Sequence, residues 1–115
     1  MAKISILSGK IECNATGKVL ESFTATKGME IVELSACVWD NTNHKPLDGQ
    51  AEIALYEYVG EKKEDIVEPT KARLIAEFKT PLKIQHYPTE GRTVKLIGTS
   101  PTSEYIAYAL RVATP

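Results

Sequence analysis

Histidine and cysteine are scarce in this sequence of 115 residues, which contains two of each. His44 and His86 stand in separate segments, with no further histidine or cysteine pair at the spacing of zinc ligands, so no zinc site is expected. Nucleophilic catalysis by Cys13 or Cys37 would need a nearby histidine held by a third group, and no pattern in the sequence supplies one. We therefore predict a protein that is not an enzyme and that holds no metal and no cofactor.

Long apolar runs are also missing. No run approaches the roughly 18 residues that a transmembrane helix requires, so membrane insertion is not expected. The N-terminal segment MAKISILSGKIECNATG holds a short, interrupted apolar patch, and no signal peptide is evident. These observations predict synthesis in the cytoplasm or a place in a virion. Because no leader is visible, two free thiols at Cys13 and Cys37 are favoured over a disulfide.

The chain also lacks an excess of charge of one sign. It has 14 basic and 15 acidic residues and a formal net charge of −1. Its arginines, Arg73, Arg92 and Arg111, are far apart in sequence, whereas neutralising phosphates requires clustered lysine and arginine. Nucleic acid is therefore not an expected partner.

The sequence does contain repeated alternation of apolar and polar residues, with a period of two. The clearest stretch is 32–38, and residues 51–59 follow the same pattern. Glu57 is an exception on the apolar face of 51–59, and Glu21 interrupts the apolar face of 19–25 in the same way. The core residues expected from 32–38 are Val32, Leu34, Ala36 and Val38. Further strands are expected within 4–13, 82–84, 94–96 and 106–112.

Two stretches are harder to assign. Residues 60–70 are polar and rich in charge and end near Pro69, which predicts a solvated loop. Residues 72–79 alternate as a strand does, yet they include the good helix formers alanine, arginine, leucine and glutamate. We favour a strand there, with a helix as the alternative.

These patterns predict an all-β fold. Seven to nine short strands, with turn signals about every ten residues, are typical of an antiparallel β-sandwich, and a small β-barrel is the alternative. No internal repeat or low-complexity linker divides the chain. Residues 1–115 are therefore expected to form a single β-sandwich domain.

A succession of turn and strand motifs adds a family resemblance. The run LSACVWD at 34–40 is an alternating strand that ends in aspartate, KPLDGQ at 45–50 is a Pro-apolar-x-Gly turn, and IALY at 53–56 opens a second alternating strand. GRTVKL at 91–96 has the form of a Gly-x-x-Val strand. Over residues 30–99 this succession resembles the bacterial immunoglobulin-like domains of the invasin and intimin type. The resemblance implies an immunoglobulin-like sandwich that serves structure, spacing or adhesion without catalysis.

The loop 40–49 gathers side chains that can bind metal ions, among them Asp40, Asn43, His44 and Asp48. The spacing of a calcium loop is not met, because Thr42 and His44 occupy positions that need aspartate or asparagine. The same residue types are turn formers, and we interpret the loop as a turn.

The candidate binding residues are aromatic. Trp39, Tyr56 and Tyr58 fall on the faces of their strands opposite the apolar residues. Aromatic side chains exposed on a sheet can anchor a protein partner or stack on a sugar, whereas a core on that face would make them structural. In addition, the segment 4–13 could pair with the open sheet edge of a neighbouring subunit.

We therefore expect a structural or assembly protein, such as a viral coat or decoration protein or a filament subunit, that acts through protein–protein contacts and self-association. The alternative is a small module that binds carbohydrate or protein through Trp39, Tyr56 and Tyr58. A third possibility is an enzyme whose site is assembled from residues far apart in sequence.

Overall fold

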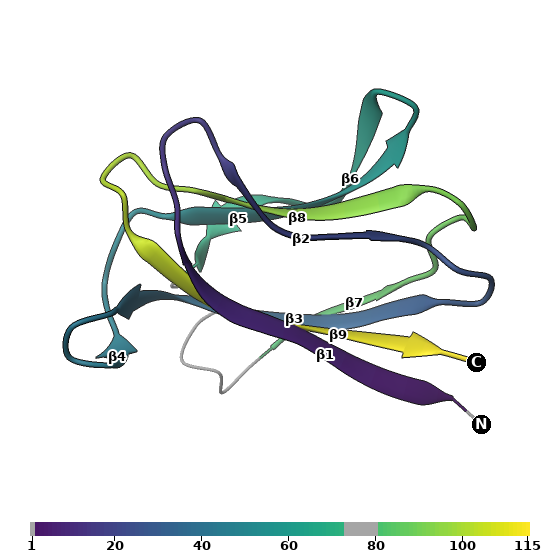
Figure 1. Ribbon diagram of the computed structural model, residues 1–115, viewed down its shortest axis with the longest axis horizontal. Coiled ribbons are helices and arrows are strands. Elements are labelled where there is room, and N and C mark those ends of the chain that lie inside the picture. The colour runs from purple at the N-terminus through teal and green to yellow at the C-terminus, as the bar shows by residue number, and fades with distance from the viewer. Residues whose placement is uncertain (1, 73–80) are drawn as a thin grey trace.

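The computed structural model describes residues 2–72 and 81–115, which form two antiparallel β-sheets packed face to face (Figure 1). Sheet A has the order β1-β9-β3, with β4 and β7 pairing with β3, and sheet B has the order β2-β8-β5-β6. The all-β sandwich predicted from the sequence is confirmed. The strands are β1 (Lys3–Glu12), β2 (Lys18–Thr24), β3 (Glu30–Asp40), β4 (Lys45–Pro46), β5 (Glu52–Val59), β6 (Lys62–Lys71), β7 (Leu82–His86), β8 (Thr93–Thr99) and β9 (Tyr105–Thr114).

The strand order is that of a jelly roll. The first strand pairs with the last, β1, β2 and β3 pass alternately between the sheets, and the β5–β6 hairpin stays within sheet B. Jelly rolls wind two Greek keys into such a double sheet. An immunoglobulin domain places its first two strands in one sheet, whereas β1 and β2 here lie in different sheets.

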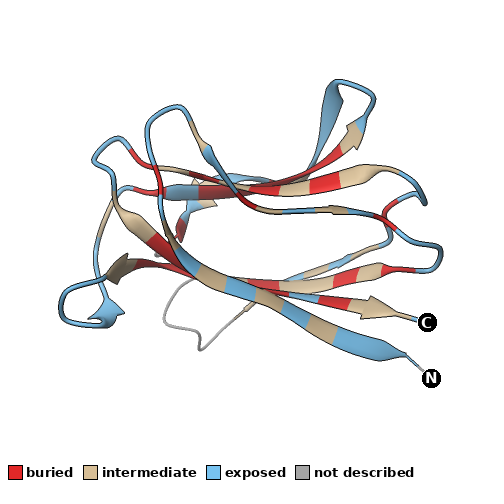
Figure 2. Cartoon of the chain, in the orientation of Figure 1, coloured by how far each residue is buried: buried red, intermediate tan, exposed pale blue. Residues whose placement is uncertain are grey.

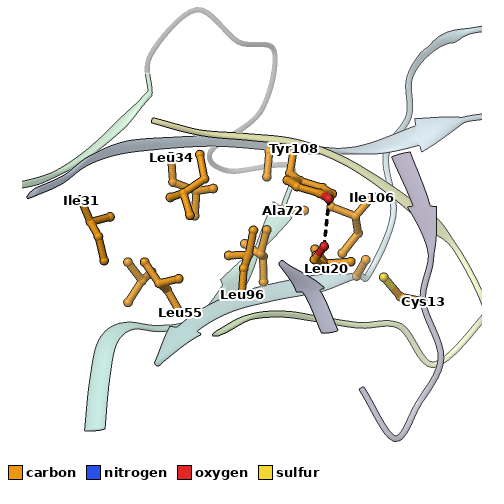
Figure 3. Close-up of a cluster of buried hydrophobic side chains, with 14 of the residues drawn as sticks. Cys13, Leu20, Ile31, Leu34, Leu55, Ala72, Leu96, Ile106 and Tyr108 are labelled. Carbon is orange, nitrogen blue, oxygen red and sulfur yellow. Dashed lines mark hydrogen bonds between the residues drawn. The ribbon is translucent and has the colours of Figure 1, made fainter. Parts of the chain in front are cut away.

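The core fills the space between the two sheets, and Figure 2 shows buried residues alternating with more exposed ones along the strands. The stretches with the clearest alternation supply most of it, as the sequence predicted. Fully buried side chains include Leu34 and Ile106 from sheet A and Leu55 and Leu96 from sheet B (Figure 3).

One predicted core residue is displaced by a bulge in β3. The register of β3 shifts between Ile31 and Glu33, so the side chain opposite Val112 is that of Ile31. Ile31 is therefore fully buried, while Val32, which the alternation had placed in the core, is only partly buried. A bulge adds one residue to a strand and reverses the facing of everything before it.

Most of the stretch 60–70 is a strand, contrary to the prediction of a solvated loop. Gly60 and Glu61 form a tight turn, with Gly60 at a φ of 63°, and β6 runs back along β5. Most of β6 is exposed because it forms an edge of sheet B, although Val67 still reaches the core. Its many charges reflect this edge position. The prediction for 72–79 lies almost entirely outside the described residues.

Tyr108 connects the two sheets from the inner face of β9. Its hydroxyl makes a bifurcated hydrogen bond to the backbone oxygen of Leu20 at 3.0 Å (Figure 3) and to Oε2 of Glu21 at 2.6 Å. The ring lies over Gly9, its direct partner on β1, where a Cβ would come within 2.9 Å of the hydroxyl oxygen. Gly9 thus provides the space that the tyrosine occupies.

Candidate functional site

The three aromatic residues predicted to bind a partner do not lie together. Trp39 is on the outer face of sheet A, in β3, whereas Tyr56 and Tyr58 are on the outer face of sheet B, in β5. The alternation correctly placed them opposite the core residues of their strands. Because the outer faces of a sandwich point in opposite directions, the three rings cannot contact one ligand together.

Tyr56 and Tyr58 form a small aromatic pair covered by lysines. Their ring centroids are 6.5 Å apart in an edge-to-face arrangement. Nζ of Lys63 lies 4.4 Å from the ring centroid of Tyr56, and Nζ of Lys95 lies 5.1 Å from that of Tyr58. Tyr56 is only 7% exposed, so little of its ring is open to a ligand.

Trp39 also lies beneath a lysine. Nζ of Lys10, from β1, is 4.3 Å from the centroid of the Trp39 ring, a cation–π distance. The indole Nε1 is buried and has no hydrogen-bond partner in the part of the chain that the structure describes. The three predicted binding residues therefore share one feature, a lysine over each ring.

The two cysteines are free, as predicted, and both are buried. Cys13 belongs to the core between the sheets, whereas Cys37 faces outward from sheet A between Trp39 and Ser35. Burial raises the pKa of Cys13 to about 11 and also raises that of Cys37. Neither thiol is in the anionic form that a nucleophile needs at neutral pH.

The outer face of sheet A has a floor of small side chains. In register across three strands, Ser35 lies beside Ala109 and Ala109 beside Ser8, while Cys37 lies beside Ala107. An open depression of about 390 Å³ lies over this floor next to β1. Its lining residues are Ser8, Gly9, Lys10, Ala107, Tyr108 and Ala109.

Two large apolar side chains stand beside this depression, on the same face of β1. Ile4 is 53% exposed and Ile6 is 57% exposed, and they pair with Ala113 and Arg111 of β9. The next residue with the same facing is Ser8, which lines the depression. The outer face of β1 therefore carries two projecting isoleucines followed by a hollow.

Strand β1 is also the least protected edge of the sandwich. It pairs with β9 from Lys3 to Glu12 without a register shift and contains no proline, and none of the described strands pairs with its other side. Proteins commonly block their edges with bulges, prolines or very short strands. By those criteria β1 is unblocked, and its charged residues, Lys3, Lys10 and Glu12, lie only near its two ends.

The other edges carry such blocks. The pairing of β2 with β8 shifts between Val19 and Glu21, and β6 contains Pro69 and two register shifts against β5. Beside β3, β4 has two residues and β7 has five. Among the described strands, β1 alone combines length, regularity and exposed apolar side chains.

A buried polar cluster surrounds Glu57, whose carboxylate lies on the inner face of β5. It accepts hydrogen bonds from the backbone N–H of Thr89 at 3.1 Å and from Nη1 of Arg92 at 3.1 Å, and Nε2 of His86 lies 2.7 Å away. Burial alone would raise the pKa of Glu57, but these hydrogen bonds outweigh it and hold the pKa below its ordinary value. With both oxygens engaged, the cluster fastens β5 to β7 and to the turn before β8.

The loop after β3 is a turn capped by Asp40, as interpreted from the sequence. Its Oδ1 accepts the backbone N–H groups of Asn43 and Thr42, both at 3.0 Å, and its Oδ2 accepts the side-chain amide of Asn43 at 2.9 Å. These hydrogen bonds, those of Asn43 first, lower the pKa of Asp40. Both carboxylate oxygens of Asp40 thus accept hydrogen bonds from residues of its own turn.

Comparison of the chain with protein-family models, curated proteins and solved structures finds no match. No helix within residues 2–72 and 81–115 has the length and apolar character needed to cross a membrane. The candidate site therefore rests on the geometry of β1 and of the outer face of sheet A.

Proposed function

We propose that the protein is a non-enzymatic assembly subunit that acts through protein–protein contacts, with β1 as its contact edge. The observation that carries the proposal is the regular, unblocked edge of β1 with Ile4 and Ile6 exposed on it. A long, flat and partly apolar edge is where sheets add strands from another chain. A partner strand would satisfy the outward backbone groups of β1 and cover the isoleucines.

The polar clusters also support a binding role over catalysis. Glu57 and Asp40 are each occupied by donors from their own chain, and the two thiols are buried. Jelly rolls occur in viral coat proteins and in lectins. By this analogy of fold, a coat or filament subunit is the kind of assembly protein that we propose.

A ligand-binding module is the alternative that the aromatic residues suggest. A sugar stacking on Trp39, Tyr56 or Tyr58 would have to displace the lysine that covers the ring. The edge of β1 needs no such displacement, because the side chains of Ile4 and Ile6 are already exposed. Assembly is therefore the function that the geometry supports best.

The test is the solution mass by light scattering over a concentration series, with and without reductant. We expect a discrete oligomer or filament that is insensitive to reductant, since both thiols are buried. Ile6→Lys should weaken the association by at least about tenfold, because a lysine loses its hydration at a paired edge, and tenfold corresponds to 1.4 kcal/mol. A monomer at every concentration would overturn self-assembly.

A matched control is Val19→Lys, which places the same charge at an exposed apolar position on β2, an edge of the other sheet. Val19 is 45% exposed, close to the exposure of Ile6. It should leave the mass distribution unchanged. Equal weakening by both variants would show that net charge, and not the β1 edge, controls association.

A further inference from the structure

We infer that the partner of β1 is the β1 strand of a second copy of this chain, and that the two strands pair antiparallel around a two-fold axis at Leu7. The two sheets A would then form one continuous sheet across the dimer. The inference rests on the proposed function, since it names the partner and the register of the contact edge proposed above.

Symmetry restricts the possible registers. A two-fold axis that makes two identical strands antiparallel neighbours in one sheet stands perpendicular to that sheet, so the core faces of both copies point the same way. Residues directly opposite each other must then share a facing. On β1, outward-facing residues such as Ile6 and Ser8 can oppose only outward-facing residues of the partner. The axis must therefore pass through a residue of β1.

Three registers keep most of the strand paired. An axis at Leu7 pairs residues 3–11 with each other, an axis at Ser8 pairs residues 4–12, and an axis at Ile6 pairs only 3–9. The longer ladders bring more backbone groups into hydrogen bonds, which favours the first two. Side-chain fit decides between them.

The Leu7 register brings each projection to a hollow. Ile6 lies opposite the partner's Ser8, whose short side chain opens onto the depression over Ala107 and Ala109. Ile4 lies opposite the partner's Lys10, which also lines the depression and whose side chain extends away from the edge toward Trp39. An axis at Ser8 would instead place Ile4 against the partner's Glu12 and Ile6 against the partner's Lys10. The isoleucines would then miss the small side chain at the hollow.

The inner face supports the same register. Leu7 is half-buried against the core, and at the axis it meets the partner's Leu7. Ile11, also half-buried, lies opposite the partner's Lys3, whose stem can shield it. No two like charges oppose each other in this arrangement. The surface is thus self-complementary, as a two-fold interface requires.

Single cysteines at Ile6 and Ser8 can measure the register, with the full chain oxidised gently under native conditions. Directly opposed residues of antiparallel strands have Cα atoms about 4.5–5.5 Å apart, within reach of a disulfide, whereas a shift of two residues brings them too far apart. In the Leu7 register, Ile6→Cys mixed with Ser8→Cys should cross-link, and neither variant should cross-link alone. A mass tag on one variant identifies the mixed dimer.

The exposure of residues 6 and 8 and the burial of the natural thiols provide the controls for this experiment. Both positions are exposed, so the cysteines should not disturb folding, and the natural thiols are buried, so the unmodified chain should give no cross-link. We expect the mixture to form at least about tenfold more disulfide dimer than either variant alone, following the same preference for opposed positions.

Each other outcome identifies what has failed. Cross-linking of Ile6→Cys alone indicates an axis at Ile6, and cross-linking of Ser8→Cys alone indicates an axis at Ser8; either overturns the proposed register while β1 remains the contact edge. Association by light scattering with no cross-link in any sample places the contact elsewhere and overturns the β1–β1 pairing. A monomer throughout overturns both this inference and the proposed function.

Discussion

His86 and Glu57 come from opposite sheets of the sandwich and meet at its side, with Nε2 of His86 2.7 Å from Oε1 of Glu57. The histidine side chain is 37% exposed and the carboxylate only 5% exposed. The glutamate is therefore the buried member, and it depends on its donors to remain charged. Stability should respond to the protonation of this carboxylate.

Replacing this carboxylate should weaken the fold most at neutral pH. Glu57→Gln should lower the free energy of unfolding at pH 7 by about 1.5–3 kcal/mol, the range for hydrogen bonds to charged groups. The pKa of Glu57 is lower in the folded protein than in the unfolded chain, so its contribution is lost as the pH falls below about 4.3. Chemical denaturation at pH 7 and pH 3 should show the difference shrinking.

The matched control is Glu52→Gln, an exposed glutamate on the same strand. It should change stability little at either pH. A difference between Glu57→Gln and the parent that is the same at both pH values would contradict the assignment of a charged, hydrogen-bonded Glu57.

Removing the hydroxyl of Tyr108 should destabilise the sandwich at neutral pH. It should also reduce the loss of unfolding free energy that the parent shows as the pH becomes alkaline. Tyr108→Phe should lower the free energy of unfolding by about 1–3 kcal/mol, because buried acceptors lose their donor. Burial, and then the Glu21 carboxylate, raise the pKa of Tyr108. The unfolded chain therefore ionises first, and stability falls as the pH rises above about 10. Denaturation at pH 8 and pH 11 tests both effects.

The exposed Tyr87, which is 66% exposed, provides the comparison. Tyr87→Phe should stay within about 0.5 kcal/mol of the parent at pH 8. If Tyr108→Phe behaves like Tyr87→Phe, the hydroxyl does not connect the sheets in solution.

Two glycines should resist substitution for different reasons. A Cβ on Gly98 would lie 2.7 Å from Sγ of Cys13 and 2.9 Å from Cδ1 of Ile106, so Gly98→Ala should destabilise by about 1–3 kcal/mol through overpacking. Gly60 has open space around it but a φ of 63°, so Gly60→Ala should destabilise by about 1 kcal/mol through the backbone. Denaturant midpoints measure both.

Asparagine separates the two causes, because it tolerates positive φ but is larger than alanine. Gly60→Asn should recover most of the stability lost in Gly60→Ala, whereas Gly98→Asn should be worse than Gly98→Ala. Recovery at Gly98 would mean that the space beside Cys13 is larger than the structure indicates.

The thiols of Cys13 and Cys37 should be unreactive toward thiol reagents in the folded protein. With a pKa of about 11, Cys13 is only about 0.1% thiolate at pH 8, and burial further blocks reagents. A colorimetric thiol reagent should therefore detect two thiols promptly in denaturant and react far more slowly without it. Rapid reaction of one native thiol, assigned by peptide mass, would locate an opening of the fold at that residue.

The sequence predicts the core faces of the long strands well, because burial on a sheet recurs with period two. Leu34, Ala36 and Val38 were placed correctly for that reason. The displacement of Val32 was not predictable, since Ile31 and Val32 are both apolar and the alternation alone does not decide which of them faces the core. Strand β6 was missed for a related reason. It is a strand because it pairs with β5, and its own polar residues do not show that pairing.

The polar contacts were visible in the sequence only as irregularities. Glu57 and Glu21 interrupt apolar faces, and each proves to be an acid facing the interior with a partner from a distant segment. His86 is 29 residues from Glu57, and such a separation gives no local signal. Charged residues that break an apolar face therefore deserve a search for a buried partner.

The sequence of β1 also contains an irregularity in its alternation of apolar and polar residues. Its isoleucines change parity along the segment, with Ile4 and Ile6 on one face and Ile11 on the other, and such a change can mark a bend or a boundary between two strands. The strand is regular, so the change of parity places Ile4 and Ile6 outside. The candidate edge follows from the absence of a bulge, which only the pairing with β9 reveals.

The pairing of β1 with β9 brings the two ends of the chain to one corner, with Lys3 directly opposite Thr114 (Figure 1). A short linker could join them, so circular permutants opened at the Gly60 turn should be sterically feasible. Anything fused to either end would also emerge beside Ile4. A bulky fusion there would obstruct the edge, whereas one inserted at Gly60 would leave it clear.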